Sequence, residues 1–351
     1  MNKKTVAVVF GGCSPEYDVS LNSSYSIIDA LDREKYEVIL LGITRDGAWY
    51  RYSGPTENIP NDTWQSDVKY LKNAFISPVR GNGIIEIETD CVTPIPVDII
   101  FPVMHGENGE DGTLQGLCEM AGLPLVGSGS AASALCMDKD RAHKLVSLAG
   151  LRVPKSVCFE VMPNEDELLE KVRPLGLPIF VKPVNAGSSI GITMVNDYSR
   201  LMEAVCTAFE YDRAVIIEEN ITGFEAGCAV IGNLELQTGR IDEIELADGF
   251  FTYEEKYTLK TSKIHVPARV DADTERRLQE AAMLAYKTLG CRGYCRVDLF
   301  LTKEGEIVFN EANTIPGFTS HSRFPSMMKA AGVDFPTLID MLIDLGFENA
   351  R

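Results

Sequence analysis

The N-terminal part of the chain alternates short apolar runs with stretches whose apolar residues recur at helical spacing. Apolar runs bounded by turn residues are typical of buried strands, and a repeat of about 3.6 residues is typical of helices. The predicted strands are residues 5–10, 36–44, 97–103 and 123–126, and the predicted helices are residues 20–31 and 111–121. This alternation predicts a parallel sheet with helices on both faces.

The remainder of the chain has strands that follow one another more closely. Gly150 and Pro154 follow an amphipathic segment, residues 138–149, and mark the end of a predicted helix. A further helix is predicted at residues 274–289, and strands at residues 179–182, 215–219, 226–232, 240–245, 294–301 and 306–310. Residues 183–191 form a Gly/Ser-rich loop, and residues 249–263 lack periodicity, which predicts a long loop. A chain of 351 residues suits two or three packed units.

The charge of the chain restricts its partners. It carries 51 Asp and Glu against 33 Lys and Arg, a formal charge of −18 that repels nucleic acid and anionic membranes. We therefore expect neither as a partner, and an anionic ligand would need a locally cationic site. No apolar run approaches the ~18 residues of a membrane span, and residues 5–10 are too short for the core of a secretory signal. Nine scattered cysteines favour free thiols in a reducing cytoplasm over disulfides or a zinc site.

Two alternating segments, residues 294–301 and 306–310, predict a β-hairpin with acidic residues on one face. Residues 302–305 would form its turn. The predicted cross-strand pairs are Leu301–Glu306, Asp298–Phe309 and Arg296–Glu311. Residues directly or diagonally opposite in such a pair share a face of the sheet, so Asp298 and Glu311 should lie near each other.

This face of the hairpin would gather one cation, two carboxylates and an amide: Arg296, Asp298, Glu311 and Asn313. Carboxylate and amide oxygens are hard ligands that suit Mg²⁺, which takes few protein ligands and keeps waters and phosphate oxygens. The alternative is a solvated surface hairpin with an Arg296–Glu311 ion pair. The apolar residues on both sides of the acids favour the metal site.

Lys182 ends a predicted strand and opens the Gly/Ser-rich loop. In such a loop, backbone N–H groups can approach phosphate oxygens while the lysine neutralises their charge. The loop is not a Walker A motif, because its lysine precedes the glycines, and it is not a G-x-G-x-x-G motif. Lys139, in the sequence Met137-Asp138-Lys139, is a second candidate. The alternatives are a mobile loop around Lys182 and a solvated helix position for Lys139.

Three acidic residues follow the next predicted strand and its turn. Glu218 and Glu219 end the strand, and Glu225 comes after Gly223. Acids in this place could accept hydrogen bonds from an adenine amine and from ribose hydroxyls. The alternative is an ordinary acidic loop.

Six segments, in this order and nearly from end to end, give the chain a family resemblance. They are G-G-C-S-P-E-Y-D-V-S (11–20), H-G-E-N-G-E-D-G-T-L-Q-G (105–116), M-D-K (137–139), K-P-V-N-A-G-S-S-I-G (182–191), R-V-D (296–298) and E-A-N-T-I-P-G-F-T-S (311–320). In these segments the chain resembles the D-alanine–D-alanine ligases and their vancomycin-resistance relatives, in the ATP-grasp superfamily.

The resemblance implies an α/β protein with the ATP-grasp fold. Residues 1–127 would form a Rossmann-like substrate domain with a parallel sheet, and residues 128–222 and 223–351 two α+β lobes that clasp ATP. The implied reaction phosphorylates the carboxylate of a first D-alanine to an acyl phosphate, which the amine of a second substrate attacks. Phosphate then leaves and a dipeptide forms. A cytoplasmic homodimer is expected.

The resemblance also implies roles around the first substrate. Glu16 would hold its ammonium group and His105 would lie nearby. Ser188 would join Glu16 to Tyr257 through hydrogen bonds. Read without the resemblance, Glu16 could be an ordinary acid at a helix N-terminus, and His105 a core histidine.

Further roles concern the reacting groups. Arg296 and the backbone N–H of Gly317 would stabilise the oxyanion, and Ser322 would meet the carboxylate of the second substrate. The residues implied to bind ATP are Lys139, Lys182, Ser188, Ser189, Glu218, Glu219, Glu225 and Asn310. Those implied to hold the metal, two Mg²⁺ ions with Mn²⁺ as an alternative, are Asp298, Glu311 and Asn313.

The second substrate could be D-alanine, D-serine or D-lactate. The chain keeps Lys256-Tyr257 where D-lactate ligases resemble one another in carrying a histidine, which argues against D-lactate. Phe251 and Arg323 resemble the residues of D-serine ligases, and residues 140–150 and 254–260 resemble the VanG type, so we expect D-serine, with D-alanine as the alternative. Arg323 also occurs in D-lactate ligases, and without the resemblance it could be a surface arginine.

Two other classes of protein share part of this pattern. Other ATP-grasp enzymes have the metal-binding acids but lack the segments at residues 11–20 and 105–116. A nucleotide-binding sensor without catalysis would need neither Glu16 nor Arg296. The preference for D- over L-amino acids rests on the resemblance alone.

Overall fold

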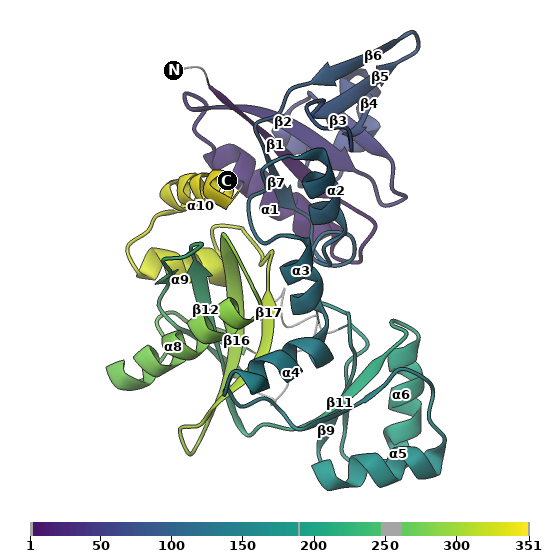
Figure 1. Cartoon of the computed structure of the whole chain (residues 1–351), viewed down its shortest axis with the longest axis vertical. Helices are drawn as coiled ribbons and strands as arrows, with labels where there is room; N and C mark the ends of the chain where they lie inside the picture. The colour runs from purple at the N-terminus through teal and green to yellow at the C-terminus, as the bar shows by residue number, and fades with distance from the viewer. Residues whose placement is uncertain (1–2, 189, 247–261, 350–351) are drawn as a thin grey trace.

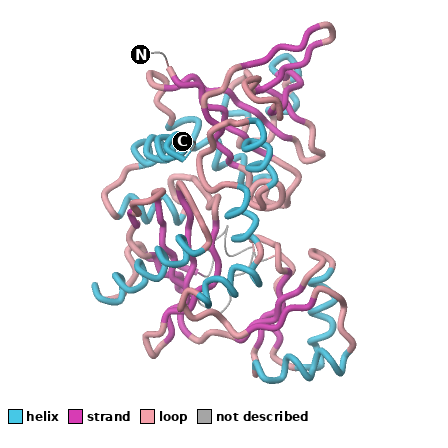
Figure 2. Tube along the Cα trace, viewed as in Figure 1, coloured by secondary structure: helices cyan, strands magenta, loops and turns pink. Residues whose placement is uncertain are grey.

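The computed structural model describes residues 3–188, 190–246 and 262–349, which form three β-sheets with helices packed on them (Figure 1; Figure 2). In Figure 1 the N-terminal sheet lies at the top, the C-terminal sheet below it and the central sheet at the lower right. The nine cysteines are free thiols, as predicted. Within the described ranges, no helix is long and apolar enough to cross a membrane.

The N-terminal sheet has seven strands in the order β6-β5-β4-β3-β2-β1-β7. They are β1 (Lys4–Gly11), β2 (Tyr36–Ile43), β3 (Trp49–Tyr52), β4 (Leu71–Ile76), β5 (Ile84–Glu88), β6 (Cys91–Ile95) and β7 (Ile99–Val103). Strands β2, β1 and β7 are parallel, as predicted. The antiparallel strands β3–β6 were not predicted, because their short, partly polar sequences give no sustained apolar run. The strand predicted at residues 123–126 is reduced to a bridge between Ile100 and Leu125.

Helices cover both faces of this sheet, as predicted. Helix α1 (Tyr17–Ala30) and the C-terminal helix α10 (Phe335–Asn349) share a core with one face, and α2 (Thr113–Ala121) packs on the other. The approach of α10 is close, because a Cβ atom added at Gly346 would lie 2.7 Å from the side chain of Ile99. The end of the chain is therefore packed against its beginning, as Figure 1 shows.

The central sheet has four antiparallel strands in the order β10-β9-β11-β8. Its elements are β8 (Ser156–Phe159), α5 (Glu165–Val172), β9 (Ile179–Pro183), β10 (Thr193–Val195), α6 (Leu201–Phe209) and β11 (Val215–Glu219), preceded by α3 (Ser130–Met137) and α4 (Lys139–Leu148). In β9, Ile179 and Val181 enter the core under α5 and α6. Strand side chains alternate, so Phe180 and Lys182 face the opposite side, toward the site described below.

The C-terminal sheet has the order β15-β14-β12-β16-β17, with β13 paired to β12. Its elements are β12 (Gly223–Ile231), β13 (Gln237–Thr238), β14 (Asp242–Leu246), β15 (Ser262–His265), α8 (Ala272–Thr288), β16 (Tyr294–Thr302), β17 (Ile307–Asn313) and α9 (Arg323–Ala330). In β16, Val297 and Leu299 pack with α8, so Asp298 points to the other face. The end of the loop predicted at residues 249–263 belongs to β15; the rest lies outside the described residues.

The register of the predicted hairpin was wrong. The observed pairs are Arg296–Asn313, Asp298–Glu311, Leu299–Phe309 and Leu301–Ile307, with an irregularity that leaves Asn310 as an extra residue. The turn spans residues 303–305, one residue fewer than predicted, and Gly305 has a φ of +80° that favours glycine. The extra residue adds one more position to the shift, two in all, so Asp298 and Glu311 still share a face.

Candidate active site

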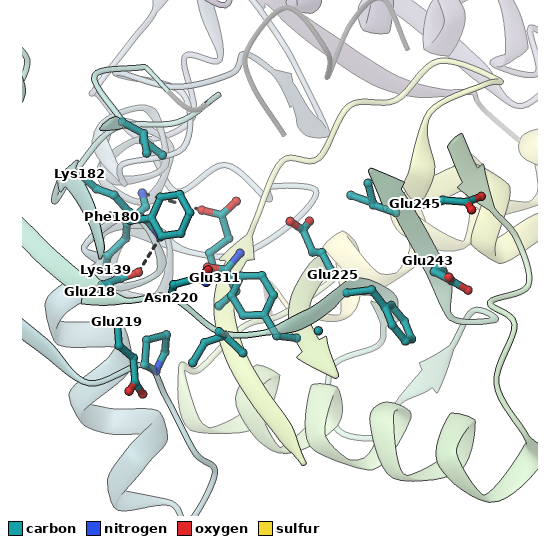
Figure 3. Close-up of a pocket in the computed structure, with 18 of the residues that line it drawn as sticks. Lys139, Phe180, Lys182, Glu218, Glu219, Asn220, Glu225, Glu243, Glu245 and Glu311 are labelled. Carbon is teal, nitrogen blue, oxygen red and sulfur yellow. Dashed lines mark hydrogen bonds and ion pairs between the residues drawn. The ribbon is translucent and has the colours of Figure 1, made fainter. Parts of the chain in front are cut away.

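A cavity of about 380 Å³ lies between the central and C-terminal sheets (Figure 3). Its volume is within the usual range for small-molecule sites. The residues predicted from the sequence that line it are Lys139, Lys182, Glu218, Glu219, Glu225, Asn310 and Glu311. The structure therefore brings together, from α4 and four strands of two sheets, residues that are far apart in the sequence.

Three aromatic residues that were not predicted also line the cavity: Phe180, Phe224 and Phe300. Phe180 lies two residues before Lys182 in β9, and Phe300 lies two residues after Asp298 in β16. Residues two apart in a strand share a face, so the alternation around Lys182 and Asp298 was a signal that could have found both phenylalanines. They give the cavity apolar surface suited to a flat ring such as a nucleobase.

The two predicted lysines lie at this cavity. The Lys182 ammonium is 2.6 Å from Glu218 Oε2, and Lys139 donates to the carbonyl oxygen of Ala186 at 2.6 Å. Burial acts to raise the pKa of the Glu218 carboxyl, but the positive charges of Lys182 and its neighbours outweigh burial and hold the pKa below its usual value. Lys139 is only 7% exposed and 3.9 Å from Glu311, so the alternative of a solvated helix lysine is wrong.

The predicted metal ligands lie on adjacent strands. Asp298 is 1% exposed and stands directly opposite Glu311, so the alternative of a solvated hairpin is wrong. Arg296 contacts Asp298 through three hydrogen bonds of 2.7–3.0 Å rather than pairing with Glu311, because both side chains lie on one strand face two residues apart. Asn313 donates its amide N–H to Asp298 at 3.1 Å.

This donor set fits a hard divalent cation. It offers two carboxylates and one amide oxygen, and Glu311 faces the cavity that contains the lysines. Within the described residues there is no cluster of three or more His, Cys, Asp or Glu side chains arranged to hold a metal. A partial set of two acids is nevertheless what Mg²⁺ uses where phosphate oxygens and waters complete its shell.

Arg323 belongs to the same buried network. It contacts Asp242 at 2.7 and 2.9 Å, Glu225 at 3.0 Å and Asp298 at 3.3 Å, so the alternative of a surface arginine is wrong. Asp242, which is fully buried, was not predicted. It also accepts a hydrogen bond from the N–H of Gly227, where a Cβ atom would lie 2.4 Å from the Arg323 guanidinium. Glycine at this position leaves room for the guanidinium beside the strand.

Glu16 and Ser188, predicted to act together, are in contact. Ser188 donates its hydroxyl to Glu16 from a backbone with a φ of +49°, a conformation rare for residues other than glycine. Glu16 is the N-cap residue of α1, but its side chain makes no capping hydrogen bond and is buried beside Gly106 and Gly187. The ordinary role of an acid at a helix N-terminus therefore does not describe it.

His105 fixes the loop that carries Gly317. Its Nδ1 donates to the carbonyl oxygen of Ile315 at 2.8 Å, and its Nε2 lies 3.2 Å from the hydroxyl of Ser23, which in turn accepts from the N–H of Phe318 at 3.1 Å. Burial lowers the pKa of His105, which favours the neutral ring. Ser23, in α1, was not predicted, since a serine within a helix pattern carries no functional signal.

Ser322 lies at the other end of that loop. Its hydroxyl accepts a hydrogen bond from the N–H of Thr319 at 3.0 Å, and a Cβ atom added at Gly317 would lie 3.3 Å from the same hydroxyl. The loop thus brings Gly317 and Ser322, two of the predicted site residues, close together. Ser189, Phe251, Lys256 and Tyr257 lie outside the described residues.

Glu110 is an unpredicted acid in the segment 105–116 that lines a smaller cavity with Lys139, Glu311 and Asn313. Its carboxyl group accepts a hydrogen bond from the N–H of Gly106 at 3.0 Å, through Oε2. Burial, reinforced by the negative charge of Glu16, raises the pKa of Glu110 to about 8. The folded protein therefore holds a proton on this group at neutral pH.

Glu110→Gln is expected to flatten the fall in stability between about pH 5 and pH 8. The folded state retains this proton up to about pH 8 while the unfolded chain loses it near 4.5, so the unfolding free energy falls as pH rises through that interval. A neutral amide removes the difference. Melting temperatures of both proteins across this range check the prediction, and equal slopes would contradict it.

Two family models match most of the chain. The model described as "D-ala D-ala ligase N-terminus" matches residues 5–128, and the model described as "D-ala D-ala ligase C-terminus" matches residues 145–344. Enzymes of this family are ATP-dependent, generally with Mg²⁺, and act on small amino-acid substrates. The predicted ligase chemistry and its nucleotide requirement therefore have independent support.

Individual relatives match over almost the full length. The crystal structure of the VanG D-Ala:D-Ser ligase from Enterococcus faecalis is 55% identical with a TM-score of 0.91, covering 98% of this chain and 100% of its own, which confirms the predicted ATP-grasp fold. The vancomycin C-type resistance protein VanC1 of Enterococcus gallinarum is 44% identical over 349 residues, 99% of this chain and 100% of the relative. The D-alanine–D-alanine ligase of Caldicellulosiruptor bescii is 40% identical over 359 residues, which cover 100% of this chain and 97% of the relative. The chain belongs to the D-alanine–D-alanine ligase family.

Proposed function

We propose that this chain is an ATP-dependent ligase that joins D-alanine to D-serine through a D-alanyl phosphate. The product would be a D-Ala–D-Ser cell-wall precursor linked to vancomycin resistance. The observation that carries the choice of D-serine is the buried pair of Arg323 and Asp242 beside Asp298. A site with a placed polar group can prefer a substrate hydroxyl, whereas an apolar pocket discriminates weakly. The 55% identity to VanG, a D-Ala:D-Ser ligase, supports the same choice.

A D-alanine–D-alanine ligase of peptidoglycan synthesis is the second candidate. Its support is the C. bescii relative, whose 40% identity is close to the 44% of VanC1. Overall identity at this level separates the two substrates poorly, because the side chains around the second substrate are a small part of the chain.

In this proposal ATP occupies the cavity between the central and C-terminal sheets. Phe180 and Phe300 supply apolar surface for the base, and the lysines Lys139 and Lys182 offset phosphate charge. The other residues assigned to ATP are Ser188, Ser189, Glu218, Glu219, Glu225 and Asn310. This placement explains why a strongly acidic chain keeps one buried and one partly buried lysine, Lys139 and Lys182, at one cavity.

Asp298, Glu311 and Asn313 would hold magnesium. When bound, the metal supplies positive charge beside the phosphate oxygens during phosphoryl transfer. The protein's contribution is the strand geometry, since the register sets the two carboxylates opposite each other. Arg296 and Arg323 compensate the charge of Asp298 in the buried network.

The first D-alanine would place its ammonium group at Glu16, which Ser188 orients by its hydrogen bond. Tyr257 would join this pair. Arg296 and the N–H of Gly317 would stabilise the oxyanion formed when the second amine attacks, a role in which fixed donors lower the barrier. His105 contributes by holding the Gly317 loop through Ile315.

The second substrate would lie between the Gly317 loop and the buried arginine. Ser322 would contact its carboxylate, with Phe251, Lys256 and Arg323 forming the rest of its surroundings. We also assign residues 1–127 to substrate binding and residues 128–222 and 223–351 to the lobes that clasp ATP. A cytoplasmic homodimer completes the proposal.

Product analysis tests the function directly. With ATP, Mg²⁺, D-alanine and competing D-serine, we expect D-Ala–D-Ser as the main product, and we expect phosphate release to require D-alanine. The measurement is chromatographic separation of the two dipeptides across a pH series. D-Ala–D-Ala as the main product at every pH would overturn the serine assignment, and ATP turnover that ignores D-alanine would overturn the ligase.

A further inference from the structure

His143, in α4, lies between the two lobes and has no part in the function proposed above. It is 2% exposed, and its ring packs edge-on against Phe309 at 5.8 Å between centroids. Its Nε2 lies 2.7 Å from the backbone carbonyl oxygen of Asn310. A carbonyl oxygen only accepts hydrogen bonds, so Nε2 carries a proton and donates it.

The other ring nitrogen faces the nucleotide side. His143 Nδ1 lies 3.6 Å from Glu218 Oε1, and both atoms are buried without a hydrogen-bond partner among the residues that the structure describes. The second oxygen of the same carboxylate holds Lys182 at 2.6 Å. Buried polar atoms are seldom left without partners. A carboxylate oxygen only accepts, so these two atoms can serve each other only when Nδ1 also carries a proton and the ring faces the carboxylate as a cation.

The Asn310 carbonyl group, which His143 holds, lies where the register between β16 and β17 changes. Asn310 is the extra residue that shifts the register between the Leu299–Phe309 and Asp298–Glu311 pairs. The direction of Glu311 therefore depends on how the backbone at Asn310 is held. Such irregularities re-aim the side chains next to them.

The segment that follows α4 strengthens the same connection. The carbonyl oxygen of Arg152 accepts from the N–H of Phe309 at 2.8 Å, and its guanidinium lies 3.3 Å from Glu219. Glu219 also accepts from the N–H of Lys155 at 3.0 Å. Strand β17 of the C-terminal sheet and strand β11 of the central sheet are thus tied through α4 and residues 152–155.

We infer that His143 is a positioning residue that sets Glu218 and Glu311 relative to each other. Its Nε2–H holds the Asn310 carbonyl and so aims Glu311, while its Nδ1 edge orients the Glu218 carboxylate beside Lys182. The inference rests on the proposed ATP ligase function. It adds a residue that contacts no substrate and links the nucleotide-binding part of the site to its metal-binding part.

Two conservative variants separate the two contacts. His143→Gln places an amide N–H near the position of Nε2 and loses the edge that faces Glu218, whereas His143→Asn places polar atoms near Nδ1 and loses the Asn310 contact. We expect His143→Gln to raise KM for ATP about tenfold with kcat within about twofold, because one contact to a charged group is lost. We expect His143→Asn to lower kcat about tenfold and to change KM for ATP less.

Calorimetric binding of ADP, with and without Mg²⁺, gives a second measure that needs no turnover. His143→Gln should weaken ADP binding in both conditions, and His143→Asn should mainly reduce the gain from Mg²⁺. Lys144→Ala is the matched control, since Lys144 is the next residue of α4, is exposed, and has Asp140 as its ion-pair partner in the part of the chain that the structure describes.

The inference is overturned if both variants change the same constant, or if neither differs from Lys144→Ala. A loss that only follows the folded fraction in thermal melts would also overturn it. Assays of the wild-type protein distinguish a failure of this inference from a failure of the proposed function. If it shows no D-alanine-dependent ATP turnover, the function fails, while the ADP and Mg²⁺ titrations still test the two contacts.

Discussion

Asp298→Asn is expected to lower kcat for dipeptide formation by at least about 10³-fold. The change preserves the shape of the side chain but removes its negative charge. Asp298 is assigned to magnesium and also carries the negative charge that faces Arg296 at 2.7 Å and Arg323 at 3.3 Å. A neutral side chain here would weaken the proposed metal site and leave the guanidinium groups of Arg296 and Arg323 with less compensation.

The expected loss of kcat in Asp298→Asn must be distinguished from unfolding of the variant. Removing one member of a buried ion pair typically costs about 3–5 kcal/mol, so kcat should be measured well below the melting transition of the variant. Asp273→Asn is the matched control, because Asp273 is an exposed acid of α8 whose ion-pair partner among the described residues is Arg276. Retention of more than about a tenth of wild-type turnover by a folded Asp298→Asn protein would contradict the assignment.

The face of the hairpin that carries Asp298 could be predicted from the sequence, and its register could not. Alternation in residues 294–301 places Val297 and Leu299 on the apolar side and Asp298 on the other, and the structure confirms this. The register depends on the length of the turn and on the extra residue Asn310. Both are decided by backbone hydrogen bonds, including one from Phe309 to Arg152, which leave no mark in the hydrophobic pattern.

Buried polar residues were the second feature that could not be predicted from the sequence. Asp242 begins the sequence Asp-Glu-Ile-Glu-Leu, which looks solvated, yet its side chain is fully buried because Arg323 comes to it from 81 residues away. His143 likewise reads as an ordinary position in a charged helix. Buried polar side chains of this kind are compensated by partners that are distant in the sequence, and the local pattern of residues does not identify those partners. The antiparallel strands β3–β6 were not predicted for a related reason, since their pairing with neighbouring strands rather than their composition defines them.

Arg323→Leu is expected to reduce both stability and the preference for D-serine. The guanidinium is buried among Asp242, Glu225 and Asp298, and leucine leaves these carboxylates without it. Breaking a buried ion pair from one side costs about 3–5 kcal/mol, measurable by denaturant unfolding. Arg240→Leu is the control, because Arg240 makes a similar two-bond contact with Glu275 at a half-exposed position.

A second substitution separates the effect on stability from the effect on substrate choice. Asp242→Asn removes one buried charge and keeps an oxygen that can accept the N–H of Gly227, so Arg323→Leu/Asp242→Asn should recover part of the lost stability. If Arg323 supplies the polar group that prefers D-serine, the ratio of D-Ala–D-Ser to D-Ala–D-Ala should stay about tenfold below wild type in the double variant. Recovery of that ratio together with stability would mean that Arg323 acts on the fold alone. An unchanged ratio in a folded Arg323→Leu protein would remove it from substrate choice, because a group that selects the hydroxyl cannot be lost without cost to that selection.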